Sequence, residues 1–135
     1  MEPLILVVED DEAVRSLSVD ILEGAGYPVI EAAQASAALR LLEQHPCVSL
    51  LFTDINMPLV NGYVLADMAV MRWPHLRVLY TTGEPTRSAA GKPAELLHGE
   101  MLTKPYRAAQ LTAAVAASLA AGWGRQALGT VVEEA

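Results

Sequence analysis

Short apolar runs alternate with amphipathic stretches along most of the chain. Five of the runs are rich in β-branched or bulky residues and predict strands at residues 4–8, 29–31, 49–53, 77–81 and 100–102. Between and after them, apolar positions recur at helical spacing over residues 12–24, 36–44, 62–72 and 107–121. This alternation predicts an α/β fold in which helices cover both faces of a parallel sheet.

The stretch from residue 84 to residue 99 fits neither pattern. It contains Pro85, Gly91, Pro93 and Gly99, which oppose a long helix. We expect at most a short helix near residues 94–98, so the helix before the last strand should be short or irregular.

The helical stretches also predict which side chains face the core. In the first, the apolar face consists of Val14, Leu17, Ile21 and Leu22. The predicted inward positions of the second and last helices are Ala38, Leu41, Leu42, Leu111, Val115 and Leu119.

Composition narrows the class of protein. A chain of 135 residues with 53% hydrophobic residues is long and apolar enough for one folded domain. The net charge of −7 and the scattered Lys and Arg residues argue against nucleic-acid binding. No apolar stretch approaches the ~18 residues of a membrane span, and no secretion signal is recognisable. The single Cys47 precludes an internal disulfide, fits a reducing cytoplasm and is expected in the core.

Residues that can bind a metal ion or take part in a reaction follow four of the predicted strands. Glu9, Asp10 and Asp11 follow the first strand, and Asp54 follows the third. The other two strands end at Thr82-Gly83 and Lys104-Pro105. The carboxyl ends of parallel strands meet at one edge, where α/β sheets open their ligand crevice. The sequence therefore predicts a site there for a metal ion and a phosphoryl group, with Asp11 capping the first helix.

With these motifs, residues 3 to about 121 resemble the receiver domain of two-component response regulators. Glu9-Asp10, Asp54-Ile-Asn-Met-Pro58, Asn61-Gly62, Thr82-Gly83 and Lys104-Pro105 all occur in the order and spacing of that family. The resemblance implies a doubly wound, flavodoxin-like sheet of five parallel strands in the order 2-1-3-4-5. We expect residues 1–121 to form this domain and residues 122–135 a tail that is flexible or docks on a neighbour.

The resemblance implies a magnesium site. Asp10 and Asp54 would bind Mg²⁺ directly, Glu9 would act through water, and Asn56 would contribute its backbone carbonyl. The residue types agree with this role, because Mg²⁺ prefers hard oxygen ligands and is usually held by one or two carboxylates.

The resemblance also implies phosphoryl chemistry at Asp54. This carboxylate would accept a phosphoryl group from a phosphohistidine of a partner kinase. Thr82 would hydrogen-bond a phosphoryl oxygen, and Lys104 would pair with the phosphoryl group or, in the free state, with Asp54. In this family the bond before the residue equivalent to Pro105 is usually cis.

Met101 departs from the family pattern. Receivers commonly carry Tyr or Phe three positions before the Lys, and that ring turns inward when the Thr moves. Methionine has neither ring nor hydroxyl. We therefore expect activation to order or shift residues 84–99 in place of a ring flip.

As a receiver, the chain would be a phosphoryl-controlled interaction module in a two-component phosphorelay, and we expect no enzymatic activity beyond its own phosphorylation and dephosphorylation. Its expected partners are a sensor histidine kinase or histidine phosphotransfer protein, contacting Ala13, Val14 and Leu17, and an unidentified downstream protein. A homodimer would use the face built from residues 84–121.

A dehalogenase-type phosphatase is disfavoured because Asn56 stands where that class needs a second Asp. The chain as the receiver segment of a larger hybrid kinase or transcription regulator remains an alternative.

Overall fold

The structure, a computed structural model, describes residues 3–83 and 97–120. The strands are β1 (Leu4–Val8), β2 (Val29–Ala32), β3 (Val48–Asp54), β4 (Arg77–Thr82) and β5 (Gly99–Thr103). The helices are α1 (Glu12–Gly24), α2 (Ala35–Gln44), α3 (Gly62–Arg72) and a further helix over residues 108–120. All strand pairs are parallel, and the sheet order is β2-β1-β3-β4-β5. Fold class and strand order are as predicted.

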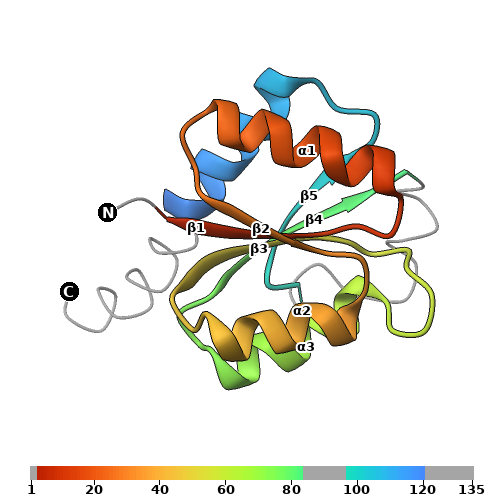
Figure 1. The fold of residues 1–135 in the computed structure, drawn as a ribbon, viewed down its shortest axis with the longest axis vertical. Helices are drawn as coiled ribbons and strands as arrows, with labels where there is room; N and C mark the ends of the chain where they lie inside the picture. Colours follow the sequence, from red (N-terminus) through yellow and green to blue (C-terminus); the bar gives the residue numbers. More distant parts are fainter. Residues whose placement is uncertain (1–2, 84–96, 121–135) are drawn as a thin grey trace.

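The sheet lies between two helical layers (Figure 1). Helix α1 and the helix of residues 108–120, drawn in blue, cover one face, while α2 and α3 cover the other. Successive residues of a strand point to opposite faces. On β1, Ile5 and Val7 accordingly join the core beneath α1, whereas Leu6 and Val8 join the core beneath α2 and α3. The central strands are therefore apolar on both sides, as expected for a covered parallel sheet.

Short-range hydrogen bonds fix the start of two helices. The side chain of Asp11 accepts from Val14 N at 3.1 Å and caps α1, as predicted. The side chain of Asn61 accepts from Val64 N at 3.0 Å and caps α3. Each cap satisfies a backbone N–H in the first turn and so fixes where its helix begins.

The predicted inner face of α1 is partly correct, because Leu22 is buried and Ile21 packs against the core as predicted, but Leu17 does not belong to it. Leu17 is 55% exposed, while Ser18, Val19 and Leu22 are buried. Ser18 lies inside because its hydroxyl is 2.6 Å from the hydroxyl of Tyr106. That partner lies 88 residues away along the chain, so the periodicity of α1 alone does not reveal it.

Other burial predictions divide in the same way. The inward positions Ala38, Leu42, Leu111 and Val115 are buried as expected. Cys47 is exposed, contrary to the expected core position, because it lies in the turn just before β3 begins at Val48.

Several predictions fall on residues 84–96 or 121–135, which lie outside the described ranges. These are most of the short helix near residues 94–98, the tail of residues 122–135 and part of the expected dimer face over residues 84–121. They stay predictions. None of the helices in residues 3–83 and 97–120 has the length and apolar character needed to span a bilayer.

Candidate functional site

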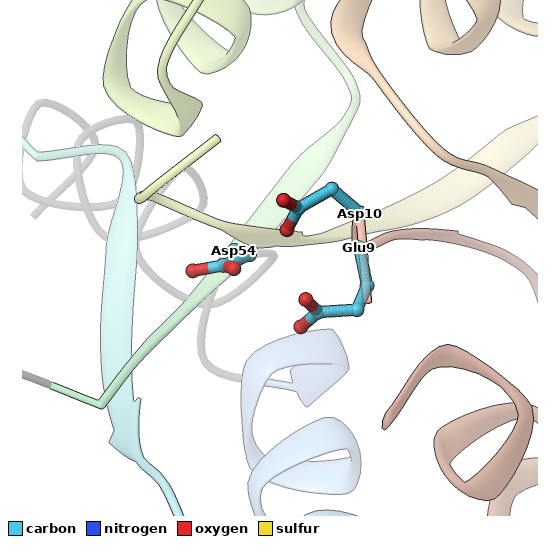
Figure 2. Close-up of side chains that lie close together, drawn as sticks. All are labelled: Glu9, Asp10 and Asp54. Carbon is cyan, nitrogen blue, oxygen red and sulfur yellow. The ribbon is translucent and has the colours of Figure 1, made fainter. Parts of the chain in front are cut away.

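Three acidic side chains meet at the carboxyl edge of the sheet. Glu9 and Asp10 follow β1, and Asp54 is the last residue of β3. One carboxylate oxygen from each lies within 4.8 Å of the others. Figure 2 shows the Glu9 and Asp10 side chains on the same side of Asp54, with their carboxylates directed toward it. Because β1 and β3 are adjacent parallel strands, their ends bring together residues about 45 positions apart. This cluster could hold a metal ion.

Asp54 is held by backbone contacts on several sides. Its side chain is nearly buried, and its Oδ1 accepts from Asn56 N at 3.0 Å. The next residue, Ile55, donates its N–H to Thr81 O at 3.0 Å and continues the pairing with β4. A Cβ on Gly62 would collide with the Asp54 carbonyl oxygen, so this close approach requires glycine. The carboxylate therefore has a defined position.

Lys104 bridges two of the acids. Its Nζ lies 2.8 Å from Glu9 Oε1 and 3.2 Å from Asp54 Oδ2. The residue follows β5, and its N–H donates to Thr82 O at 2.8 Å. The Lys104–Pro105 peptide bond is cis. One ammonium group thus faces both buried carboxylates, which leaves the cluster with excess negative charge.

Glu9 is an acid of this cluster whose pKa is shifted, and burial is the main cause. Burial raises the pKa of Glu9 from 4.5 to about 7, against the opposing effect of Lys104 and of the Asp11 N–H, which donates to Glu9 Oε2 at 3.1 Å. Burial also lowers the pKa of Lys104, but its hydrogen bond to Glu9 and the charge of Asp54 outweigh this, so the net shift is upward. A carboxyl group that resists ionisation in this way would gain from a further cation beside it.

Asp10 and Asn56 occupy the outer side of the cluster. The Asp10 side chain is exposed, and its carboxylate makes no hydrogen bond or ion pair with the residues described. The side-chain amide of Asn56 donates to Thr82 Oγ1 at 3.0 Å. Thr82 itself is fully buried at the end of β4. The structure thus gathers every residue that the sequence placed at the metal and phosphoryl site.

Two neighbours of the site escaped the sequence analysis. Arg15 on α1 donates from Nη1 to Glu9 O at 2.8 Å and from Nε to Glu31 Oε1 at 2.9 Å. Tyr106 lines a hollow of about 160 Å³ beside Lys104, together with Val14, Leu17 and Pro105. A basic residue one turn into a helix that starts at the site is a usable signal for the first, since helical side chains point back toward the N-terminus. For Tyr106, the only sequence feature that could have indicated its place beside the site is that it directly follows Lys104-Pro105.

Met101 lies on β5 opposite Tyr80 of β4. It is half-buried and packs on the core beneath α2 and α3, in which Tyr80 is fully buried. The Tyr80 hydroxyl accepts from His98 N at 3.1 Å, and burial raises the Tyr80 pKa to about 12. The aromatic ring next to Met101 is therefore that of Tyr80, which belongs to β4 and is held by this hydrogen bond. The predicted role of residues 84–99 in activation stays a prediction.

Comparison with known proteins identifies the family. Residues 5–116 match the response regulator receiver domain. The chain is 34% identical over 116 residues to the response regulator protein FleR of Pseudomonas aeruginosa, covering 86% of this chain and 24% of FleR. It is also 34% identical over 102 residues to the response regulator receiver protein CpdR of Brucella abortus, covering 76% of this chain and 84% of CpdR.

A solved structure agrees. The receiver domain of the hybrid histidine kinase CckA superposes with a TM-score of 0.73 at 31% identity, covering 86% of this chain and 98% of that domain. Receiver domains interact in general with histidine kinases and downstream targets. Family match, sheet order and strand-end residues agree, and the chain therefore belongs to the response regulator receiver domains of two-component systems.

Proposed function

We propose that Asp54 accepts a phosphoryl group from a sensor histidine kinase or histidine phosphotransfer protein, and that its phosphorylation switches protein contacts or passes the group onward. The observation that carries this proposal is the position of the Asp54 carboxylate, within reach of Lys104 Nζ and of the Glu9 and Asp10 carboxylates. A nucleophilic carboxylate beside a fixed ammonium is the arrangement that phosphoryl transfer to an acid requires.

The transfer step needs charge compensation. An oxygen of Asp54 attacks phosphorus, and the P–N bond to the donor imidazole breaks. The electron pair remains on the imidazole nitrogen, which takes up a proton from solvent. Carboxylate and phosphoryl group are both anionic, so Lys104, already 3.2 Å from Asp54, offsets the charge on the phosphoryl oxygens.

The acid cluster fits Mg²⁺ by its donor chemistry. Asp10 and Asp54 would hold the ion directly, Glu9 through water, and Asn56 by its backbone carbonyl. When bound, the ion supplies positive charge to the phosphoryl oxygens. The exposed Asp10 carboxylate, which has no partner among the described residues, supports its assignment as a ligand.

Thr82 and Asn56 supply the first step of the switch. In the structure the Thr82 hydroxyl accepts a hydrogen bond from the Asn56 amide. On phosphorylation Thr82 would exchange this partner for a phosphoryl oxygen, while Lys104 stays with the phosphoryl group. The exchange would pull on the end of β4, where Thr82 pairs with Thr103 of β5, two residues after Met101.

The hollow beside Lys104 is the surface for the phosphodonor protein. Its lining is largely apolar, and Leu17 at its rim is 55% exposed. Leu17→Asp should slow phosphoryl transfer from a histidine kinase and leave labelling by acetyl phosphate unchanged. Met71→Asp, at an 84% exposed position on α3, is the matched control. Equal transfer rates in the two variants would remove this surface from the proposal.

Phosphorylation of its own Asp54 and loss of that group are the only reactions we propose for the chain, and we place it in the cytoplasm. The alternative is a receiver segment within a larger hybrid kinase or transcription regulator. This alternative is supported by the coverage of FleR, of which the chain spans about a quarter, and by the likeness to the receiver of a hybrid kinase.

Incubation with Mg²⁺ and acetyl phosphate tests the proposal. The intact mass should rise by one phosphoryl unit, and Asp54→Asn should abolish the increase. Asp20→Asn, at an exposed position on α1, should be labelled like the unsubstituted chain. A base-labile label that persists on Asp54→Asn would refute the assignment.

A further inference from the structure

We propose that Arg15 is a positioning residue that sets the geometry of the metal site through the backbone of Glu9. This inference rests on the proposed function, because it concerns the Mg²⁺ ligands assigned there. Among the described residues, Arg15 contacts none of the three carboxylates of the cluster. Its guanidinium instead joins the carbonyl of Glu9 to the carboxylate of Glu31 on β2.

The contacts of Arg15 are short and sheltered. Nη1 lies 2.8 Å from Glu9 O, and Nε lies 2.9 Å from Glu31 Oε1. The Arg15 side chain is 17% exposed, compared with 55% for Arg72 in its ion pair with Glu43. A planar guanidinium with two fixed partners loses orientational freedom and acts as a rigid link. Arg15 therefore ties α1, β2 and the end of β1 together.

This link completes the immobilisation of Glu9. The Glu9 N–H donates to Ala32 O at 3.1 Å, and the Glu9 carbonyl accepts from Arg15. The plane of the Glu9–Asp10 peptide is thereby fixed, and from it the Asp10 side chain departs. The exposed Asp10 carboxylate has no hydrogen-bonding partner in the described part of the chain, so its aim depends on this backbone.

Charge and position predict opposite effects of Arg15 on metal affinity. Arg15 is a cation near a cation site, so by charge alone its removal should strengthen Mg²⁺ binding. Glu31 at 2.9 Å neutralises much of that charge. If Arg15 acts by holding the Glu9 carbonyl, its removal lets the Asp10 carboxylate wander and weakens Mg²⁺ binding.

The experiment measures Mg²⁺ affinity by calorimetry for the unsubstituted chain, Arg15→Gln, Glu31→Gln and Arg72→Gln. We expect Arg15→Gln to weaken binding roughly tenfold, at the low end for outer partners of metal ligands. Glu31→Gln removes the charge of this partner but keeps an oxygen that can accept from Arg15 Nε, and it should weaken binding only about twofold. Arg72→Gln removes the same charge from an exposed pair and should bind as the unsubstituted chain does.

A second readout separates positioning from a general loss of fold. The Mg²⁺ concentration that gives half of the maximal labelling rate with acetyl phosphate should be higher for Arg15→Gln. The maximal rate at saturating Mg²⁺ should be the same. Equal or tighter Mg²⁺ binding by Arg15→Gln would overturn the inference and leave the proposed function intact. Failure of the unsubstituted chain to bind Mg²⁺ would overturn both. If Arg15→Gln does not fold, Arg15→Lys, which keeps the positive charge but lacks the planar guanidinium that joins both partners, decides by the same criterion.

Discussion

The interior of the sheet and its carboxyl edge lie on the same strands but follow different rules. On β3, Leu50, Leu51 and Phe52 are 0–2% exposed and surrounded by apolar side chains. Two residues after Phe52, the same strand ends in Asp54, which is 4% exposed and shares one lysine with another buried acid. In the interior each residue type suits its surroundings, whereas at the edge charges are buried in excess.

The backbone shows the same contrast. Leu59, in the loop after β3, has φ of 73°, a conformation that bulky residues rarely adopt, and is 92% exposed. Three residues later, Gly62 packs directly against the Asp54 carbonyl. Features that cost stability gather where the chemistry lies, as expected for functional sites. Substitutions in the interior should therefore lower stability. At the edge, replacing a buried acid or a residue with an unfavourable backbone conformation should raise it.

The largest effect is expected in the interior. Leu51→Ala should lower the free energy of unfolding by roughly 3 kcal/mol, because it removes apolar contacts from a fully buried position and leaves a cavity. Urea unfolding measures this value. The same substitution at Leu17, which is 55% exposed, should change stability by under about 1 kcal/mol. Similar losses at both positions would contradict the burial described.

Gly62 tests the tight approach at the edge. Gly62→Ala should lower the free energy of unfolding by roughly 2 kcal/mol, since its Cβ would collide with the Asp54 carbonyl oxygen and lie 2.8 Å from Ile55 Cα. Gly24, at the end of α1, has nothing within 4 Å of a built Cβ. Gly24→Ala should be neutral or stabilising by up to about 1 kcal/mol. Chemical denaturation of the pair would refute this account if Gly62→Ala were the milder change.

Replacing Glu9 should change stability in the opposite direction and raise the free energy of unfolding at high pH. Its pKa is raised by burial from 4.5 to about 7, so between these values the folded chain holds a proton that the unfolded chain releases. Stability from this group is present below pH 4.5 and is lost as the pH rises to about 7. Glu9→Gln should flatten this dependence and add roughly 1–2 kcal/mol at pH 8, less than the full shift because Lys104 loses a partner.

Unfolding curves at pH 5 and pH 8 without divalent ions check the Glu9 prediction. The gain of Glu9→Gln over the unsubstituted chain should be larger at pH 8 than at pH 5. If Glu9→Gln were less stable at pH 8 than the unsubstituted chain, the ionised acid would stabilise the carboxyl edge, and the expected cost of burying it would be wrong.

The smallest effect concerns Leu59. Leu59→Asn should raise the free energy of unfolding by about 0.5–1 kcal/mol, because Asn tolerates positive φ better and an exposed side chain gives up little packing. Leu59→Ala removes the same side chain without easing the backbone and should give no gain. Melting temperatures of the two variants compare them directly, and equal values would exclude backbone strain as the cause.

The same contrast explains how far the sequence alone reaches. The strands, their parallel arrangement and the meeting of Glu9, Asp10, Asp54, Thr82 and Lys104 were predictable, because periodicity and strand polarity place strand ends at one edge. The strand order came from the resemblance to receiver domains. The buried Ser18, the exposed Cys47 and the link made by Arg15 were not. Each depends on a partner or turn that periodicity does not encode, such as Tyr106 for Ser18 and Glu31 for Arg15.

In the proposed function, the charges at the carboxyl edge serve the phosphorylation of a single acid, Asp54. Borohydride reduces an acyl phosphate to an alcohol and marks the residue that carried it. After labelling with acetyl phosphate and Mg²⁺, reduction and peptide mapping should find homoserine in place of Asp54 and nowhere else. A mark on Glu9, on Asp10 or on no residue of the carboxyl edge would contradict the account.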